Sequence, residues 1–236
     1  MVAKMHNKKA PGRDCIIAYW IKHMTSLHQN LKRLMREVMD GKLELPNWLI
    51  QCRTILLPKS TETEKAKNYR PIACLNITYK LYTGILNDFL EDHCRLNDIV
   101  AVEQAGGKRG SWGCTDQLLI NKMILEEVTQ YRRTAFFMWF DYKKAFDSIP
   151  HEWLFKALEL AKVPKIIIES IRNLVSNWQT EISLQTEKEI FVTELINYIG
   201  GLLQGDSLVL LLFVLCINPL SFLLNKYCDG YHIGKP

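Results

Sequence analysis

The chain has 236 residues, of which 48% are hydrophobic and 23% are charged, so it is long enough to bury a core and is typical of a globular protein. Its seven cysteines are odd in number, widely spaced and contain no C-x-x-C pair, which argues against a disulfide framework or a zinc site. The polar N-terminus lacks the apolar core of a signal peptide. We therefore expect an intracellular protein, in the nucleus or cytoplasm, that is not secreted.

The formal net charge of +5 is unevenly distributed along the chain. Residues 1–70 contain 14 Lys or Arg against 6 Asp or Glu, whereas the rest contains 16 against 19. A basic first part joined to a slightly acidic remainder suits a protein that binds a polyanion with one part and keeps carboxylates for chemistry in another. Chance clustering on a solvated surface explains the charge alone equally well.

The first 70 residues predict a helix, a strand and a charged loop. Apolar side chains recur at three-and-four spacing over residues 16–38, which predicts one amphipathic helix ended by Gly41. A short strand is predicted over 54–57. Residues 59–70 are rich in Lys, Glu and Thr and predict a solvated loop. Its four basic residues are Lys59, Lys65, Lys67 and Arg70.

The middle of the chain predicts two helices and a buried strand. Apolar residues over 81–90 lie on one side of a helix. The four glycines of residues 106–115 indicate a flexible, cationic loop, after which Asp116 is placed to cap a helix that runs to about residue 129. Every residue from 135 to 140 is apolar, which predicts a strand covered on both faces that ends at Asp141.

Two helices, over about 151–161 and 164–178, and paired strands near 180–186 and 189–198 are predicted next. Residues 207–225 carry no charge, and the aliphatic part, 208–224, is close to the length that crosses a bilayer. Asn218 and Pro219 lie inside it and no aromatic belt flanks it. A buried helix is therefore favoured, and a membrane-anchored protein with a single span over 208–224 is the minority interpretation.

The stretch F-D-Y-K-K-A-F-D-S-I, residues 140–149, carries the clearest chemical signal. A buried strand would deliver the Asp141 carboxylate at its end, where it could hold a divalent cation on a rigid element. The alternative is that Asp141 only ends the strand and caps the next turn. Asp147 is expected to cap the helix that begins near Pro150.

This stretch resembles the first catalytic block of reverse transcriptases. The resemblance implies that Asp141 binds both catalytic magnesium ions and that the carbonyl of Tyr142 is a further metal ligand. It also implies that the ring of Phe146 excludes a ribose 2′-hydroxyl and so selects deoxynucleotides.

Residues 200–213 resemble the second block of the same family, G-x-x-Q-G-x-x-x-S-P-x-L-F. Gln204 and Gly205 would lie against the templating base and the incoming nucleotide, because glycine lets backbone approach and glutamine offers donors and an acceptor. The chain departs from this pattern at Val209 and Leu210, where Ser and Pro are usual, so the start of the helix is less polar.

Three further blocks resemble the fingers of non-long-terminal-repeat retrotransposon enzymes. They are K-x-P-G-x-D at 9–14, N-[FY]-R-P-I at 68–72, and Glu103-Gln104 with Gly110, Thr115 and Asp116, which resemble E-Q-x-G-F-x-x-G-x-x-T-x-D. By this resemblance Arg70, with Lys59 as a weaker candidate, would neutralise the triphosphate of the incoming nucleotide. Nucleic-acid binding would fall to the nearby basic residues Lys65, Lys67, Lys108 and Arg109.

The resemblance covers nearly the whole chain and implies an α+β fold, the fingers and partial palm of a right-hand polymerase, helix-rich with a small antiparallel palm sheet. Residues 1 to about 130, with the basic loop 59–70, would be the fingers, and about 131–236 an incomplete palm without its remainder or the thumb. The implied partners are an RNA template, a DNA primer and a deoxynucleoside triphosphate, with magnesium as cofactor. No specific protein partner is expected.

Right-hand polymerases use two metal ions, which need more than one carboxylate. In the family the others come from a [FY]-x-D-D hairpin, and no D-D dipeptide occurs in these 236 residues. The sequence therefore predicts a retroelement-derived fragment related to RNA-templated DNA synthesis that is catalytically incomplete. The alternative is a non-catalytic nucleic-acid-binding module that retains the basic fingers.

Overall fold

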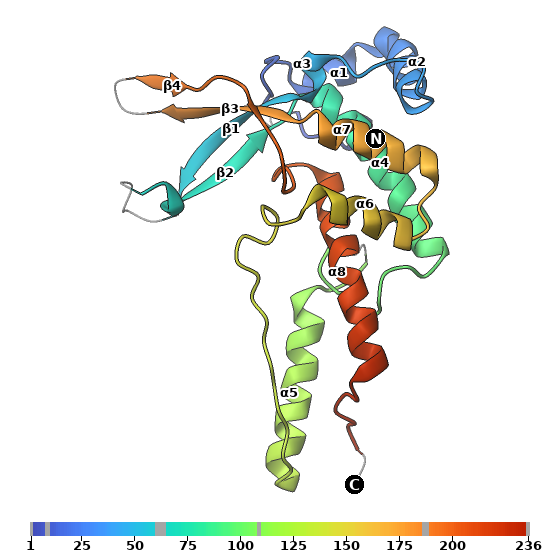
Figure 1. The fold of residues 1–236 in the computed structure, drawn as a ribbon, viewed down its shortest axis with the longest axis vertical. Coiled ribbons are helices and arrows are strands. Elements are labelled where there is room, and N and C mark those ends of the chain that lie inside the picture. Colours follow the sequence, from blue (N-terminus) through green and yellow to red (C-terminus); the bar gives the residue numbers. More distant parts are fainter. Residues whose placement is uncertain (1, 8–9, 60–64, 108–109, 186–188, 235–236) are drawn as a thin grey trace.

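A mixed sheet and a group of packed helices form the body of the molecule, from which two long helices extend (Figure 1). The computed structural model describes all residues except 1, 8–9, 60–64, 108–109, 186–188 and 235–236. The expected α+β class is confirmed. The helices are α1 (Ala18–His23), α2 (His28–Met39), α3 (Asn47–Ile50), α4 (Ile77–Leu96), α5 (Cys114–Tyr131), α6 (His151–Leu160), α7 (Lys165–Ser176) and α8 (Ser207–Tyr227), with single 3-10 turns at Val2–Lys4, Thr25–Leu27 and Ala66–Asn68.

The sheet joins strands from both ends of the chain. Its strands are β1 (Gln51–Pro58), β2 (Tyr69–Cys74), β3 (Gln179–Gln185), β4 (Ile190–Val192) and β5 (Ile196–Asn197). The strand order is β2-β1-β3-β4, with β5 paired to β3. Strand β1 is antiparallel to β2 but parallel to β3. The sheet is therefore mixed, where an antiparallel one was expected, and it crosses the boundary expected near residue 130.

The helix predicted over 16–38 is broken in the middle. Helix α1 ends at His23, Met24 adopts φ −85° and ψ 65°, and a 3-10 turn leads into α2. The His28 ring forms a 2.7 Å hydrogen bond with the Ile21 carbonyl, so a side chain occupies a carbonyl that a continuous helix would use for its backbone. The predicted end at Gly41 is confirmed, since α2 stops two residues earlier and Gly41 takes a φ of +70°.

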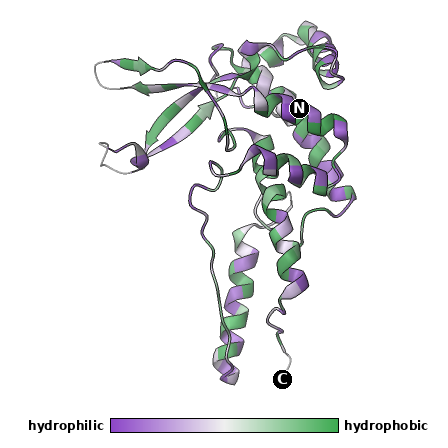
Figure 2. Cartoon of the chain, in the orientation of Figure 1, coloured by the Kyte–Doolittle hydropathy of each residue, from purple (hydrophilic) through white to green (hydrophobic). Residues whose placement is uncertain are grey.

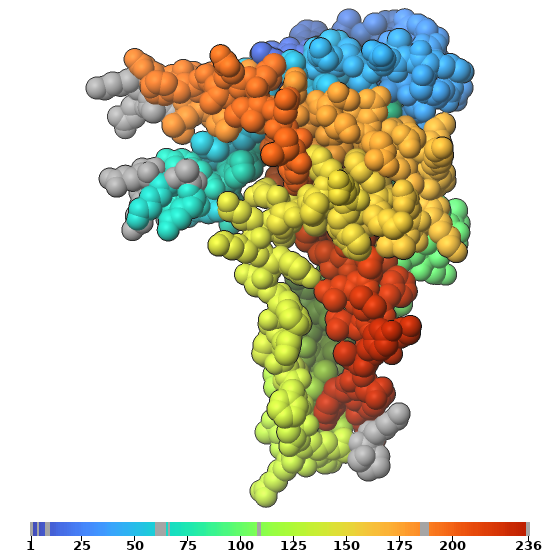
Figure 3. Space-filling model, in the orientation of Figure 1, coloured from blue at the N-terminus to red at the C-terminus, as the bar shows by residue number. Residues whose placement is uncertain are grey.

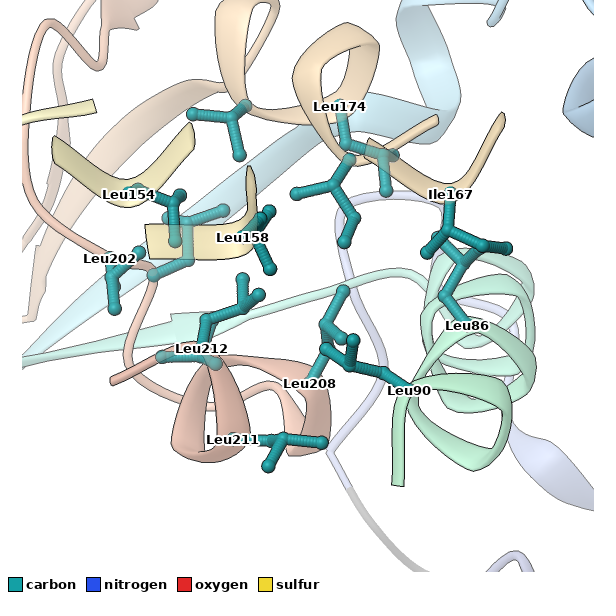
Figure 4. Close-up of a cluster of buried hydrophobic side chains, with 14 of the residues drawn as sticks. Leu86, Leu90, Leu154, Leu158, Ile167, Leu174, Leu202, Leu208, Leu211 and Leu212 are labelled. Carbon is teal, nitrogen blue, oxygen red and sulfur yellow. The ribbon is translucent and has the colours of Figure 1, made fainter. Parts of the chain in front are cut away.

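The core lies where α4, α6, α7 and α8 meet beneath the sheet (Figure 4). Each helix contributes leucines that are fully buried, namely Leu86, Leu154, Leu158, Leu174 and Leu212. Helices α6 and α7 carry apolar residues at the spacing that the sequence predicted, so their buried stripes face this cluster. Close packing here fixes the start of α8, which follows directly on the glutamine-glycine turn.

Helix α8 is the apolar segment for which a membrane span was the minority interpretation. By length and composition it is long and apolar enough to cross a membrane, and it is the one such helix among the described residues (Figure 2). Its first half is nevertheless buried in the core. Asn218 is held to the loop that follows α4, where its side chain accepts from the Ala101 amide at 2.9 Å and donates to the Ile99 carbonyl at 2.8 Å. Packing of this kind is typical of a core helix.

The prediction of a strand over residues 135–140 is wrong. Residues 133–142 form no regular element, and Phe136, Met138, Trp139 and Phe140 are 96, 76, 76 and 72% exposed. A strand is stable only when its backbone pairs with a neighbour, and no described residue supplies one. The segment runs extended beside α5 instead (Figure 1).

Asp116 does not cap α5 as predicted. The helix begins two residues earlier, at Cys114, and Gly113 occupies the N-cap position with a φ of +64°. Asp116 lies in the first turn, where its charge still favours the positive end of the helix dipole.

Candidate active site

Two of the resembling blocks, one before α6 and one before α8, meet in the structure. The amide of Leu202 donates to the carbonyl of Phe146 at 3.0 Å, and that of Gly201 to the carbonyl of Ile149 at 2.8 Å. The rings of Phe146 and Phe213 are 4.6 Å apart. Backbone bonds and ring packing therefore hold Phe146 beside the second block, as a shared site requires.

Gln204 is joined to the first block through its side chain. Its Nε2 donates to Oδ1 of Asp147 at 3.1 Å. Asp147 therefore does not cap α6 as predicted, since that helix begins after Pro150 with no side-chain cap. The bond leaves the Gln204 amide oxygen as an acceptor for another group.

The Gln204–Gly205 turn also touches strand β2. The carbonyl of Gln204 accepts from the Ala73 amide at 2.9 Å. Gly205 has a φ of +129°, and a Cβ there would lie 2.5 Å from the carbonyl oxygen of Ala73. Glycine is required at this place because the backbone of the turn lies directly on the strand. Since β2 also carries Arg70, the turn is joined to the basic hairpin.

Gly201 supports the contact between the two blocks, which gives a prediction with an adjacent control. Its φ is +82°, a Cβ would lie 2.9 Å from the Asp147 carbonyl oxygen, and its own carbonyl bonds the His151 ring at 2.9 Å. We expect Gly201→Ala to destabilise the fold by about 2 kcal/mol, because both the conformation and the close approach oppose a side chain. Gly200→Ala meets open space and should change stability by less than about 0.5 kcal/mol in urea titrations. Equal effects would show that the close contact is not formed.

Asp206, one residue past the turn, is a site residue that the sequence analysis missed. It is buried, and its Oδ1 accepts from the Thr83 hydroxyl at 2.8 Å and the Leu208 amide at 3.4 Å. Burial raises its carboxyl pKa from 3.8 to about 6, against the lowering effect of these bonds and of the Lys80 charge. An Asp directly before an apolar helix is a usual N-cap, and that signal could have found it.

The basic residues of the 59–70 loop gather at the free end of the β1–β2 hairpin. The amide of Lys59 donates to the Asn68 carbonyl at 2.7 Å, and its Nζ lies 3.4 Å from the Lys67 carbonyl. Lys59, Lys65, Lys67 and Arg70 are all exposed, as predicted. The molecule is recessed between this hairpin and the segment from α5 to α6 (Figure 3). Lys108 and Arg109 lie outside the described residues.

A second group of cations on the sheet was also missed. Glu181 binds the Nε of Arg13 and the Nε of Arg53, both at 3.0 Å, and its side chain is 9% exposed against 39% for each arginine. Arg53 and Leu57 are four residues apart on β1, so they lie on the same face, and Leu57 pairs with Arg70 of β2. Arg53 and Arg70 therefore share a face of the sheet. Two guanidinium groups on one carboxylate leave a net positive charge on that face.

Asp141 and Tyr142 are not brought onto a rigid element. Both are exposed and lie in the segment that lacks regular structure. Within the described parts of the chain there is no group of three or more His, Cys, Asp or Glu residues that could hold a metal ion. One exposed carboxylate and one carbonyl do not fit a two-metal site by themselves.

Comparison with known proteins defines the class. Residues 57–234 match the family model described as reverse transcriptase (RNA-dependent DNA polymerase), so the chain belongs to this family. Members of the family generally use divalent metal ions. The expected type, the reverse transcriptase domain of non-long-terminal-repeat retrotransposons, is confirmed by the relatives.

Three relatives illustrate the match. The chain is 25% identical over 178 residues to the Pol polyprotein of the type-2 retrotransposable element R2DM of Drosophila melanogaster, which covers 75% of the chain and 16% of that protein. It is 24% identical over 240 residues to the transposon TX1 149 kDa protein of Xenopus laevis, covering 98% and 17%. It is 28% identical over 215 residues to the R2 Pol polyprotein of Popillia japonica, covering 89% and 28%. The chain thus spans about a sixth to a quarter of these relatives.

Proposed function

We propose that the chain forms the fingers and first part of the palm of an enzyme that copies RNA into DNA from deoxynucleoside triphosphates. The observation that carries this proposal is the joining of the two blocks by two hydrogen bonds. The Leu202 amide donates to the Phe146 carbonyl at 3.0 Å, and Gln204 Nε2 donates to Asp147 Oδ1 at 3.1 Å. By the resemblance, Phe146 and Gln204 lie at the incoming nucleotide.

In this proposal the basic hairpin neutralises the nucleotide's triphosphate. Arg70 offers a planar guanidinium suited to phosphate oxygens, and Lys59 lies beside it at the end of β1. Gln204 keeps an amide oxygen for the nucleotide or templating base, since Asp147 occupies its donor. Phe146 would exclude the ribose 2′-hydroxyl. Lys65 and Lys67 of the hairpin and the Arg13–Arg53 pair would contact template or primer phosphates.

The chain is proposed to be catalytically incomplete as it stands. Asp141 would be one magnesium ligand and the Tyr142 carbonyl another. Two cations about 4 Å apart need further carboxylates to hold them in register. The described residues form no group of three or more His, Cys, Asp or Glu that could hold a metal ion. We therefore propose that it binds nucleic acid but does not extend a primer at a useful rate.

The proposal is tested by measuring binding and synthesis with the same purified chain. An RNA template annealed to a fluorescent DNA primer is titrated with protein at several salt concentrations, and primer extension is followed with magnesium and all four deoxynucleotides. We expect salt-dependent binding without extension. Neutralising Lys59, Lys67 and Arg70 together should lower the slope of log affinity against log salt by about 2 to 3, since each phosphate contact contributes about 0.9.

A matched control is offered by α2, where Lys32, Arg33 and Arg36 carry the same charge away from the proposed site. Neutralising these three should leave the slope within about 0.5 of the wild-type value. Extension by the chain that Asp141→Ala abolishes would overturn the claim of incompleteness. Absence of salt-dependent binding, or equal losses from both triple variants, would overturn the proposed site itself.

A non-catalytic nucleic-acid-binding module is the second candidate, favoured by the exposed basic hairpin together with the absence of a metal-binding cluster from the described residues. It predicts the same binding, but no dependence on the identity of the nucleotide. Stabilisation of the bound complex by the complementary deoxynucleotide, and not by the other three, would exclude this candidate.

A further inference from the structure

A buried chain of polar groups runs beneath the Gln204–Gly205 turn. The indole Nε1 of Trp178, which follows α7, donates to the Tyr79 hydroxyl of α4 at 2.8 Å. Tyr79 is fully buried, and this burial, followed by the charge of Asp206, raises the pKa of its hydroxyl. Asp206 in turn accepts from Thr83, one helical turn beyond Tyr79. The Asp206 carboxyl group therefore joins α4 to the start of α8, and Tyr79 of α4 links the residue after α7 to the same helix.

The same carboxyl group connects to the turn through the backbone. Asp206 is the N-cap of α8 and follows Gly205, while Gln204 is bonded to Ala73 of β2 on one side and Asp147 on the other. Moving Asp206 would move both attachments, since one residue separates it from Gln204. Its second oxygen, Oδ2, is buried with no hydrogen-bond partner among the described atoms. Burying a charge with an unused acceptor costs free energy, which favours the neutral form of this carboxyl group.

The ionisable groups around Asp206 stay in one protonation state near neutral pH, so the Asp206 carboxyl group is the one of this set that changes its charge there. From α4, Tyr79 and Lys80 face it, and Cys52 of β1 acts on Tyr79 from the other side. Burial raises the pKa of Tyr79 well above 10 and that of Cys52 to about 11, so both stay protonated. His151 lies against the far face of Trp178, with ring centroids 6.1 Å apart, and needs a control of its own.

We propose that Asp206 is the positioning residue of the Gln204–Gly205 turn, so that the placement of Gln204 at the nucleotide follows the charge of the Asp206 carboxyl group. Ionised, the carboxylate accepts strongly from Thr83 and from the first turn of α8 and holds the turn on β2. Protonated, the carboxyl group no longer costs the fold a buried charge, but it accepts more weakly and holds the turn less tightly on β2. This inference rests on the proposed function of Gln204, but it describes a conformational property that can be measured without synthesis.

The test follows two protons of the chain by nitrogen-edited nuclear magnetic resonance between pH 5 and 8. They are the Ala73 amide, which bonds Gln204, and the Trp178 indole N–H, which bonds Tyr79. We expect both to titrate with a common midpoint near pH 6, and both titrations to vanish in Asp206→Asn. Thr83→Val should raise the midpoint by about one pH unit through loss of a charge-assisted bond, whereas Thr83→Ser should restore it.

Two controls separate positioning from general loosening. His151→Gln should leave the common midpoint in place. In Asp206→Ala the Ala73 amide should exchange with solvent at least tenfold faster, while the Val163 amide, bonded to Leu158 in the turn after α6, should keep its rate. Titration that persists in Asp206→Asn, or an Ala73 amide that ignores the Thr83 variants, would overturn the proposal. A chain that passes these tests but binds no nucleic acid would refute the proposed function alone.

Discussion

Asp206→Asn is expected to raise the free energy of unfolding at pH 7.5 by up to about 3 kcal/mol. Folding raises the carboxyl pKa from 3.8 to about 6, and each unit corresponds to about 1.4 kcal/mol against the charged form. Asparagine carries no charge, is itself a good N-cap, and can still accept from Thr83. The substitution therefore removes a cost without removing the cap.

The sign of this effect gives its pH dependence. Because the folded pKa is raised, the neutral carboxyl contributes full stability below about pH 4, and that contribution is lost as pH rises through about 6. The variant's advantage should therefore be near zero at pH 4 and full at pH 7.5. Urea denaturation at both values measures it. The control Asp147→Asn, at an exposed carboxyl, should show no comparable gain. A variant less stable than wild type at pH 7.5 would contradict the argument.

Gly12→Ala is expected to destabilise the fold by about 3 kcal/mol or more. Gly12 lies in the block K-x-P-G-x-D and is buried against the first turn of α4. A Cβ there would lie 2.6 Å from the Cα of Asn76 and closer still to its amide nitrogen and side-chain oxygen. Backbone atoms cannot move aside as the end of a flexible side chain can, so the loop around Gly12 and the start of α4 would separate.

Separation would also break the bonds that Asn76 makes to the Asp14 amide, 3.3 Å, and the Trp48 carbonyl, 2.6 Å. The matched control is Gly230→Ala, where a Cβ meets no atom within 4 Å. Thermal unfolding of the two variants should differ by at least 5 °C, with Gly12→Ala the lower. Similar midpoints would mean that the first block is not packed on α4.

The helices could be predicted because their signals are local. The apolar spacing of α4, α6 and α7 depends on residues within one segment. The structure has α6 and α7 within two residues of the predicted bounds, whereas α4 begins four residues before and ends six residues after the predicted apolar stripe. Of the β1–β2 hairpin, only the first strand and the charged loop were predicted. Strand β2 was not predicted, and its first residues, Tyr69 and Arg70, were expected in the loop. The break at Met24 was not, because the apolar stripe continues through it and only the His28 bond to Ile21 marks it.

The predictions that were wrong, and the contacts that were missed, concern residues whose partners are distant in sequence. Arg53 and Glu181 meet because β1 lies parallel to β3, and no feature of either segment announces that register. Residues 135–140 have a strand-like composition, but composition does not supply a neighbouring strand. Asp147 was expected to serve the nearest helix and instead bonds Gln204, fifty-seven residues away.

The unpaired run that precedes Asp141 has a practical consequence. Its amides and carbonyls are available to any extended segment, and its large side chains, led by Phe136 at 96% exposed, offer apolar contact once such a segment arrives. Two molecules can pair these segments as neighbouring strands and bury each other's apolar side chains, so self-association should increase with protein concentration. A lysine in place of Met138 would act as a gatekeeper and keep the protein monodisperse, because charge at an open strand edge opposes pairing.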